Sequence, residues 1–304
     1  MNGPKVVEPI SELRSMLDEA RGNGRRIGFV PTMGFLHEGH ASLMRRARAE
    51  NDLVLVSIFV NPLQFGPSED FEAYPRDFEE DLALCEAESV DLVFHPPVEE
   101  MYPEPTTLTV TVGPIGEVLE GKTRPGHFDG VATVVSKLFN IAGPCRAYFG
   151  EKDAQQLVVI RRLARQLDFP VEVIGCPTVR EPDGLAMSSR NTYLKGEDRV
   201  AAAVLKRALD EGARLVGAGH GSADAISQAM ARVIGEEPIA KLDYAACVDP
   251  DTLAEPAEGG GPILLAVAAW VGKARLIDNV TVSPAPDSGA RTGTPKAGAS
   301  IRKG

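Results

Sequence analysis

Residues 52–61, DLVLVSIFVN, form an almost continuous run of apolar and β-branched side chains, and this run decides the fold class. A strand with one face in water alternates apolar and polar residues, whereas a strand covered on both faces of a parallel sheet reads as a continuous apolar run. The run therefore predicts a buried strand of a parallel sheet. The preceding residues 25–34, RRIGFVPTMG, are typical of a shorter strand that leads into a loop.

Around these two strands the sequence alternates between helical and strand-like patterns. Further strands are expected at 91–96, 146–150 and 171–179. Helices are expected at 10–21, about 39–50, 77–88, 130–143 and 153–167. This alternation predicts an α/β fold with a doubly wound, Rossmann-like parallel sheet.

The pattern changes near residue 186. Two Ala-rich helical segments come first, at 197–217 and 221–235. Three strand-like runs follow them without intervening helices, at 242–248, 263–271 and 274–282. We therefore expect a Rossmann-like N-terminal domain over residues 1–186 and a smaller α+β C-terminal lid domain over residues 187–282. Residues 283–304 are rich in Ser, Pro, Gly, Ala and Thr and lack aromatic side chains, so we expect a disordered tail.

The composition argues against several functional classes. A net charge of −11 over 304 residues disfavours nucleic acid or an anionic membrane as a partner, because both need a basic face. No apolar run reaches the ~20 residues of a membrane span, and the N-terminus lacks the apolar core of a signal peptide. The four cysteines show no C-x-x-C spacing, so free thiols in a reducing cytoplasm are expected, without a zinc site or a redox pair.

The segment PTMGFLHEGH (residues 31–40) stands where the strand expected within residues 25–34 ends and a helix begins. Open α/β sheets bind ligands at this position. His37 and His40 are three residues apart and can point the same way, and Gly34 and Gly39 allow close approach of the backbone. The free N–H groups of a helix N-terminus suit phosphate. A zinc-protease motif would need two histidines four residues apart, so that alternative is rejected.

The pattern H-x-G-H after a first strand resembles the signature of the nucleotidyltransferase superfamily, which implies attack on the α-phosphate of a nucleoside triphosphate. Together with further segments, the chain resembles the pantothenate synthetase family over roughly residues 8–282. The matching segments are PTMGFLHEGH (31–40), FVNPLQFG (59–66), YPR (74–76), HFDGVATVV (127–135), FGEKDAQQL (149–157) and REPDGLAMSSRN (180–191).

The resemblance implies an ATP-dependent, AMP-forming condensation of pantoate with β-alanine to pantothenate, through a pantoyl-adenylate. The implied catalytic residues are His37, His40 and Lys152, with His40 as the catalytic proton donor. Gln64 and Gln156 are implied to hold pantoate, and Gln64 also to lie near β-alanine. The implied ATP-binding residues are Met33, Gly34, Phe35, Leu36, His37, Glu38, Gly39, His40, Gly150, Glu151, Lys152, Asp153, Val179, Met187, Ser188, Ser189 and Arg190.

Several expectations at this site rest on fewer observations. Asn61 is expected to support the substrate loop. Asp81 is expected to help hold Mg²⁺, although an acidic helix is more often a solvated face. Asp129 departs from the basic or small residue that the family pattern leads us to expect, which puts the detailed roles of His127 and Phe128 in doubt. A homodimer is implied by the resemblance alone.

Two other functions compete with this interpretation. A cofactor adenylyltransferase would use the same H-x-G-H chemistry but release a dinucleotide-like product. The residues after the first domain favour a second-substrate lid instead. A nucleic-acid-binding module with the tail as a basic arm is opposed by the net charge of −11 and by the absence of aromatic residues from the tail.

Overall fold

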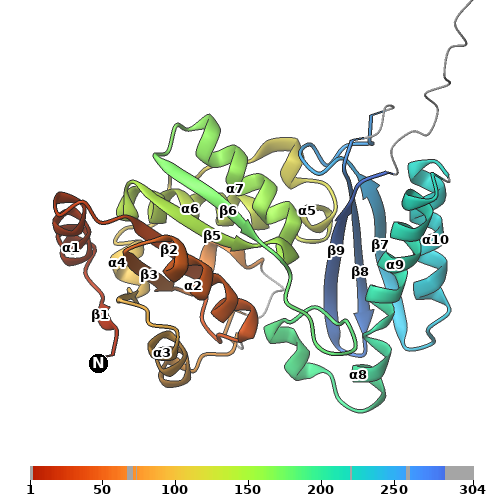
Figure 1. Ribbon diagram of the computed structural model, residues 1–304, viewed down its shortest axis with the longest axis horizontal. Helices are drawn as coiled ribbons and strands as arrows, with labels where there is room; N and C mark the ends of the chain where they lie inside the picture. Colours follow the sequence, from red (N-terminus) through yellow and green to blue (C-terminus); the bar gives the residue numbers. More distant parts are fainter. Residues whose placement is uncertain (1–2, 67–70, 73, 220, 258–260, 285–304) are drawn as a thin grey trace, which may run out of the picture.

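The computed structural model describes residues 3–66, 71–72, 74–219, 221–257 and 261–284. Within them, the strands form a six-stranded parallel sheet and a three-stranded antiparallel sheet, which stand side by side (Figure 1). The predicted Rossmann-like parallel sheet followed by an α+β unit is therefore confirmed. The boundary at residue 186 stays a prediction, and from residue 285 onward the expected tail lies outside the described residues.

The parallel sheet has the strand order β1 (Lys5–Val7), β4 (Leu92–Phe94), β3 (Leu53–Ile58), β2 (Ile27–Thr32), β5 (Cys145–Gly150) and β6 (Val171–Cys176). Its connections contain α1 (Ile10–Gly22), α2 (Glu38–Glu50), α3 (Phe78–Ala87), α4 (Val98–Met101), α5 (Glu120–Thr123), α6 (His127–Ala142) and α7 (Ala154–Gln166), and the 3-10 turns η1 (Pro62–Gln64), η2 (Gly113–Gly116) and η3 (Glu151–Asp153). The sequence patterns missed β1 and the short helices α4 and α5.

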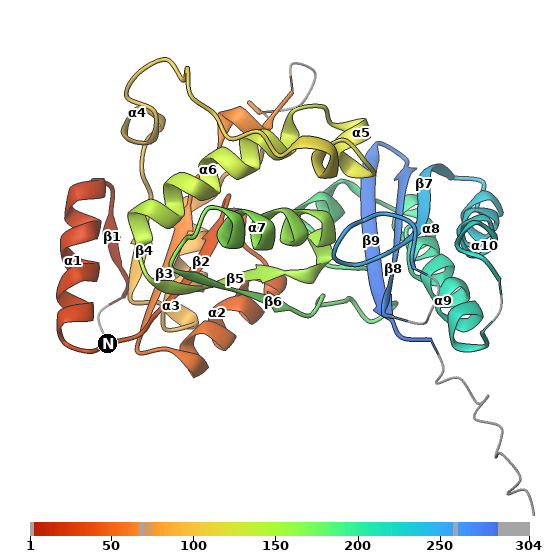
Figure 2. The ribbon, with the colours of Figure 1, turned by 90° about the horizontal axis from the view of Figure 1, so that it is seen from above.

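Both faces of the sheet are covered, as the apolar run in β3 predicts. Leu53 and Leu55 pack into the core that α1, α6 and α7 form on one face. Val54 and Val56 pack into the core under α2 and α3 on the other face. Figure 2 shows α6 and α7 on one side of the sheet and α2 on the opposite side. Every residue of β3 is buried, so the strand has no solvent-exposed face and its sequence does not alternate between apolar and polar residues.

The sheet reverses its winding direction between β2 and β5. From β2 the chain builds outward through β3 to β4, whereas β5 and β6 extend the other side. β2 pairs with β5 only at Gly28 and Phe29, although β2 continues beside β3 as far as Thr32 and β5 continues beside β6 as far as Gly150. The two strands therefore part at their carboxyl ends, and a crevice opens at the switch point, where such sheets bind ligands.

Pro31 explains why β2 and β5 separate. The carbonyl of Thr32 accepts a hydrogen bond from the N–H of Phe59, next to β3, at 3.1 Å. Successive residues of a strand turn their hydrogen-bonding groups to opposite sides, so residue 31 faces β5. Proline has no N–H to donate to a ladder. The pairing with β5 therefore ends where the sequence removes a donor.

The C-terminal unit is a second layer beside this crevice. The antiparallel sheet runs in the order β7 (Ala240–Val248), β8 (Ile263–Val271) and β9 (Ala274–Val282). Its helices are α8 (Glu197–Ala201), α9 (Val204–Gly217) and α10 (Ala223–Gly235), preceded by the turn η4 (Ser189–Tyr193). The segment expected as one helix over 197–217 is divided near residues 202–203. Helices α9 and α10 cover one face of the sheet (Figure 1). Strand β9 runs next to η3 and η4.

None of the helices in the described part of the chain combines the length and apolar character of a membrane span. The four cysteines, all within the described residues, are free thiols, as their spacing predicts.

Helix α6 fixes the turn η1 through one glycine. A Cβ atom on Gly130 would lie 2.2 Å from the carbonyl oxygen of Leu63 and 2.6 Å from Cα of Gln64. The side-chain amide of Asn61 also donates to the carbonyl of Gly130 at 3.1 Å. The backbone of η1 therefore lies directly on the helix, and its position depends on the absence of a side chain at residue 130.

We expect Gly130→Ala to lower the melting temperature, because a methyl group there forces backbone to move, and overpacking of this kind costs about 1–3 kcal/mol. The matched control is Gly22→Ala, at the end of α1, where an added Cβ meets nothing within 4 Å. That control should leave the melting temperature unchanged or slightly higher, since alanine restricts the unfolded chain. Calorimetry checks the pair, and equal melting temperatures would contradict the packing argument.

Candidate functional site

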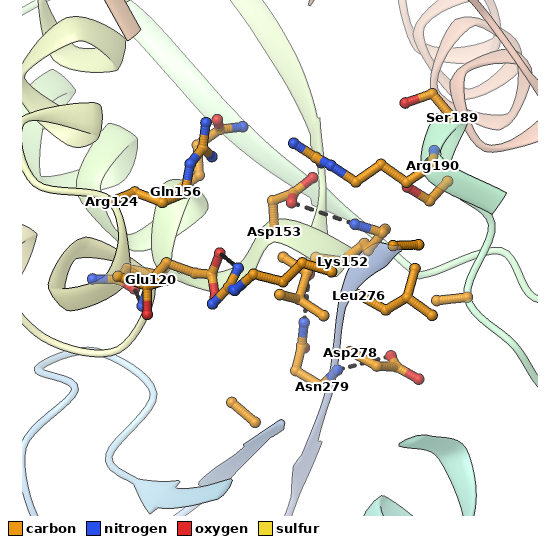
Figure 3. Close-up of a pocket in the computed structure, with 18 of the residues that line it drawn as sticks. Glu120, Arg124, Lys152, Asp153, Gln156, Ser189, Arg190, Leu276, Asp278 and Asn279 are labelled. Atoms are coloured by element: carbon orange, nitrogen blue, oxygen red, sulfur yellow. Dashed lines mark hydrogen bonds and ion pairs between the residues drawn. The ribbon is translucent and has the colours of Figure 1, made fainter. Parts of the chain in front are cut away.

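Two connected cavities occupy the crevice. The inner cavity, of about 240 Å³, lies between the parted strand ends and α6. The outer cavity, of about 440 Å³, continues between the parallel sheet and β9. Lys152, Gln156 and Arg190 line both of them, and Figure 3 shows these three side chains around the common space.

The loop from β2 to α2 passes through two left-handed residues in succession. Gly34 has φ 81° and Phe35 has φ 52°. A side chain on Gly34 would put Cβ 2.8 Å from a carboxylate oxygen of Asp81, so the position requires glycine. The carboxylate of Asp81 accepts the N–H of Phe35 at 2.9 Å and the N–H of Leu36 at 2.6 Å. These two hydrogen bonds stabilise a turn that is otherwise unfavourable for a non-glycine residue.

Asp81 therefore lies behind the loop. The residue is 2% exposed, and burial raises the pKa of its carboxyl although the two backbone N–H groups oppose that rise. It lines a third cavity, of about 300 Å³, and neither of the two connected ones. The expected role of Asp81 in holding Mg²⁺ gains no support from this position, because both oxygens already accept hydrogen bonds from the loop.

His37 and His40 bracket the first turn of α2. Nδ1 of His37 accepts the N–H of Gly39 at 3.1 Å, and Nδ1 of His40 accepts the N–H of His37 at 3.2 Å. The two rings are 4.1 Å apart between centroids. A neutral imidazole that accepts at Nδ1 carries its hydrogen on Nε2, so the hydrogen-bond network assigns each ring an N–H donor at Nε2.

The electrostatics of the pair favour this neutral form. Burial is the largest effect that lowers the pKa of His40, and together with the proximity of His37 and Lys152, against the opposing effect of Asp153, it brings that pKa to about 3. Burial and Lys152 also lower the pKa of His37. At neutral pH both rings are therefore uncharged hydrogen-bond donors in the ligand-free site.

The turn after β5 supplies a cation. Nζ of Lys152 lies 3.5 Å from the Asp153 carboxylate, and its side chain is 17% exposed. Although burial alone raises the pKa of Asp153, Lys152 and Arg190 lower it on balance. Arg190 lies two residues after Ser188, whose hydroxyl accepts the N–H of Arg190 at 3.3 Å at the start of η4. Two cations from different segments thus converge on the same cavity.

Gln64, which is 7% exposed, lines the inner cavity. Its Nε2 lies 2.7 Å from Sδ of Met33, and its Oε1 accepts a hydrogen bond from Asn61 at 3.3 Å. Asn61 is held in turn by Tyr102, whose hydroxyl donates to Oδ1 of Asn61 at 2.8 Å. The expectation that Asn61 supports this loop agrees with these contacts. Four apolar residues of α6 form the adjoining wall: Val131, Val134, Val135 and Leu138.

The two neighbouring glutamines of α7 differ in their surroundings. Gln155 is buried and structural, because its amide donates to the carbonyls of Ile115 and Val118 and accepts the N–H of Glu120. Gln156 lines both cavities, and no hydrogen bond of its side chain is seen among the described residues. Gln156 is thus the one with hydrogen-bonding capacity left for a ligand.

The expected ATP residues divide into two groups. Those that line one or both connected cavities are Met33, His37, Gly39, His40, Gly150, Lys152, Asp153, Val179, Met187, Ser188, Ser189 and Arg190. The others shape the adjoining backbone or face elsewhere: Gly34, Phe35, Leu36, Glu38 and Glu151. Val179 and Met187 are joined by a backbone hydrogen bond of 3.0 Å, so the two segments form one wall.

Three further polar residues line both cavities without having been assigned a role from the sequence: Tyr74, Arg124 and His127. Tyr74 belongs to the YPR segment and His127 to the HFD segment, so both residues lie in segments that carry the family resemblance and could have been identified from them. His127 contacts the carbonyl oxygen of Gln64 through Nδ1 at 2.8 Å. Asp129 lines neither connected cavity, and its carboxylate accepts the N–H of Val112 at 2.8 Å. Asp129, the residue that departs from the family pattern, therefore makes this hydrogen bond outside the two cavities.

The geometry suits a polyphosphate beside a small polar acid. Cations and imidazole N–H groups meet the N-terminus of α2, where backbone N–H groups favour anions. The inner cavity combines an apolar wall with a few amides, which is typical of sites that orient a small substrate. Among the described residues, no group of three or more His, Cys, Asp and Glu side chains is arranged to hold a metal ion.

Comparison with known proteins agrees with this chemistry. The family model for pantoate-beta-alanine ligase matches residues 5–281. A pantothenate synthetase of Thermotoga neapolitana is 56% identical over 276 residues, covering 90% of this chain and 98% of that protein. The crystal structure of pantothenate synthetase from Thermus thermophilus is 51% identical, with a TM-score of 0.85, and covers 91% of this chain and 98% of that one.

A third relative is described with ligands. The pantoate-beta-alanine ligase of Francisella tularensis, whose crystal structure is a complex with beta-gamma ATP and beta-alanine, is 35% identical with a TM-score of 0.74, and covers 91% of this chain and 97% of that one. The family model spans nearly the whole chain, and the relatives match it over nearly their full length. This chain therefore belongs to the pantoate–β-alanine ligase family.

Proposed function

We propose that this chain condenses pantoate with β-alanine in two steps, through a pantoyl-adenylate formed from MgATP in the connected cavities. One observation carries the proposal. Lys152, Arg190 and the two neutral histidines converge at the switch point, directly beside the buried amide of Gln64. The Francisella tularensis relative, described in complex with beta-gamma ATP and beta-alanine, supports the same choice of substrates.

In the first step a carboxylate oxygen of pantoate attacks the α-phosphorus of ATP. A P–O bond forms to that oxygen, the bond to the β-phosphate oxygen breaks, and pyrophosphate leaves with the electron pair. Negative charge grows on the departing oxygens, so donors fixed nearby stabilise the transition state more than the ground state. Lys152 and Arg190 supply positive charge, and His37 and His40 supply Nε2–H donors.

The state of His40 refines its role. With a pKa near 3 in the ligand-free site, the ring is neutral at neutral pH before ATP binds and offers an Nε2–H donor. We therefore assign it hydrogen-bond donation to the phosphates. The entering triphosphate raises the pKa of both rings, since a nearby negative charge favours the imidazolium.

Pantoate is proposed to lie in the inner cavity with its hydroxyl and carboxylate oxygens on Gln64 and Gln156. Amides can orient these groups without adding charge that would repel the triphosphate. Its dimethyl carbon would meet the apolar wall of α6 formed by Val131, Val134, Val135 and Leu138. Met33 and Asn61 hold the Gln64 amide in place.

In the second step the amine of β-alanine attacks the acyl carbon of the adenylate. The C–N bond forms, the C–O bond to the phosphate breaks, AMP leaves, and the amine loses a proton. Adenylate is a good leaving group, so no protein nucleophile is required. We place β-alanine next to Gln64, in the inner cavity.

Mg²⁺ is proposed to enter with ATP as part of the substrate. The described residues offer no carboxylate cluster for a resident ion, and Mg²⁺ usually keeps several waters and binds substrate phosphates. Phosphate oxygens and water would therefore provide most of its ligands. The homodimer implied by the family likewise stays a prediction.

The intermediate gives the first test of this mechanism. Because the adenylate forms without the amine, the chain should exchange labelled pyrophosphate into ATP when pantoate is present and β-alanine is absent. Omitting pantoate is the control and should abolish the exchange. Pantothenate synthesis without any exchange would contradict a freely reversible first step.

A second test separates the two steps by mutation. His40→Ala and Lys152→Ala should each slow adenylate formation by about 10²–10³, the cost typical of one preorganised donor. Given preformed pantoyl-adenylate and β-alanine, both variants should form pantothenate at nearly the parent rate, because pyrophosphate has already left. Single-turnover kinetics measures each step.

Lys195→Ala provides the control, because Lys195 is exposed and lines neither cavity. If His40→Ala and Lys152→Ala lost the second step as severely as the first, their role on the phosphates would have to be abandoned.

A further inference from the structure

A side chain of the C-terminal unit holds the turn that carries Lys152. Asn279, on β9, is 8% exposed, and its amide nitrogen donates to the carbonyl of Glu151 at 3.0 Å and to the carbonyl of Lys152 at 2.7 Å. Figure 3 shows Asn279 reaching this turn from the strand below it. One –NH₂ group has two hydrogens, so it can satisfy both carbonyls at once.

The neighbouring residue fixes Asn279 itself. Asp278 is 2% exposed, and one of its carboxylate oxygens accepts the backbone N–H of Asn279 at 2.8 Å. The two oxygens also accept hydrogen bonds from both terminal nitrogens of the Arg180 guanidinium, at 2.6 and 2.9 Å. Such bidentate pairs are strong and geometrically specific.

Arg180 follows Val179, which lines the inner cavity, and it also donates to the carbonyl of Asn279 at 3.2 Å. Two adjacent residues of β9 are thus bound to two separate walls of the site. Asp278 is bound to the segment that contains Val179, and Asn279 to the turn that contains Lys152. The strand bridges the crevice where β5 and β6 end.

We propose that Asn279 is a positioning residue for the phosphate step, and that it directs Lys152 into the cavity by fixing the backbone of η3. The proposal rests on the function proposed above, which places Lys152 on the phosphates. In this role the C-terminal unit affects the first chemical step without contacting any substrate. A change in this backbone displaces the ammonium group, and small displacements of a catalytic group have large effects on rate.

The test compares two variants of Asn279 with one control on the same strand. Asn279→Asp keeps the shape but removes both donors, and Asn279→Ala removes the group. Thr281→Ala is the control, because Thr281 is exposed on β9 and lines neither cavity. Pyrophosphate exchange measures the first step, aminolysis of preformed pantoyl-adenylate measures the second, and thermal unfolding is recorded for each protein.

We expect both Asn279 variants to slow exchange by roughly 10–100-fold, the loss expected for two hydrogen bonds, while aminolysis and the control stay close to the parent. The KM for pantoate should not change. The deficit of Asn279→Asp should shrink as the pH falls, because its protonated carboxyl regains one donor. If Asn279→Ala fails to fold, Asn279→Asp carries the test.

Two results would overturn the proposal. Exchange at the parent rate in Asn279→Asp would show that its donors do not position Lys152. An equal loss in both steps would show that Asn279 only ties the two units together. If the parent chain itself shows no exchange, the function proposed above fails, which is a different result from a failure confined to the variants.

Discussion

The separation of β2 from β5 at Pro31 is the constraint on which the rest of the site depends. A proline in a central strand removes one ladder hydrogen bond, and here the missing donor faces β5. The two strands are paired on the amino-terminal side of Pro31, at Gly28 and Phe29, and they separate on its carboxyl-terminal side. The loop after β2 and the turn after β5 then leave the sheet in different directions, and each places its polar groups on one side of the same crevice. Neither segment could line a cavity if the two strands remained paired to their ends.

This opening gathers positive charge in a protein whose net charge is −11. Lys152 and Arg190 reach the crevice from two segments, and burial keeps the nearby histidines neutral, so the site offers donors without excessive repulsion between cations. Buried polar groups are costly unless they have partners. The supporting hydrogen bonds from Asp81, Asn61 and Asn279 meet this requirement for the backbone and amides around the cavity. The C-terminal unit therefore helps to hold the site's residues in place as well as covering the site.

The sequence predicted the parts of this arrangement that follow from local pattern. The unbroken apolar run of β3 indicated burial on both faces, and the polar segments after successive strands indicated one shared edge. The role of Asp81 could not be predicted, because an acidic helix has the same pattern whether its first turn faces water or a neighbouring loop. Asn279 was missed because it is a single amide in a strand, and its partners lie more than a hundred residues earlier. Such contacts depend on how the two units pack, which periodicity does not report.

In the proposed first step, a carboxylate oxygen of pantoate attacks the α-phosphorus of ATP at the switch point. The most direct measurement uses pantoate labelled with ¹⁸O in its carboxylate, followed by mass spectrometry of the products. Attack at the α-phosphorus joins one labelled oxygen to phosphorus, and aminolysis then breaks the C–O bond, so AMP should contain a single ¹⁸O atom. Unlabelled AMP, or label in inorganic phosphate with ADP as the nucleotide product, would exclude attack of pantoate at the α-phosphorus.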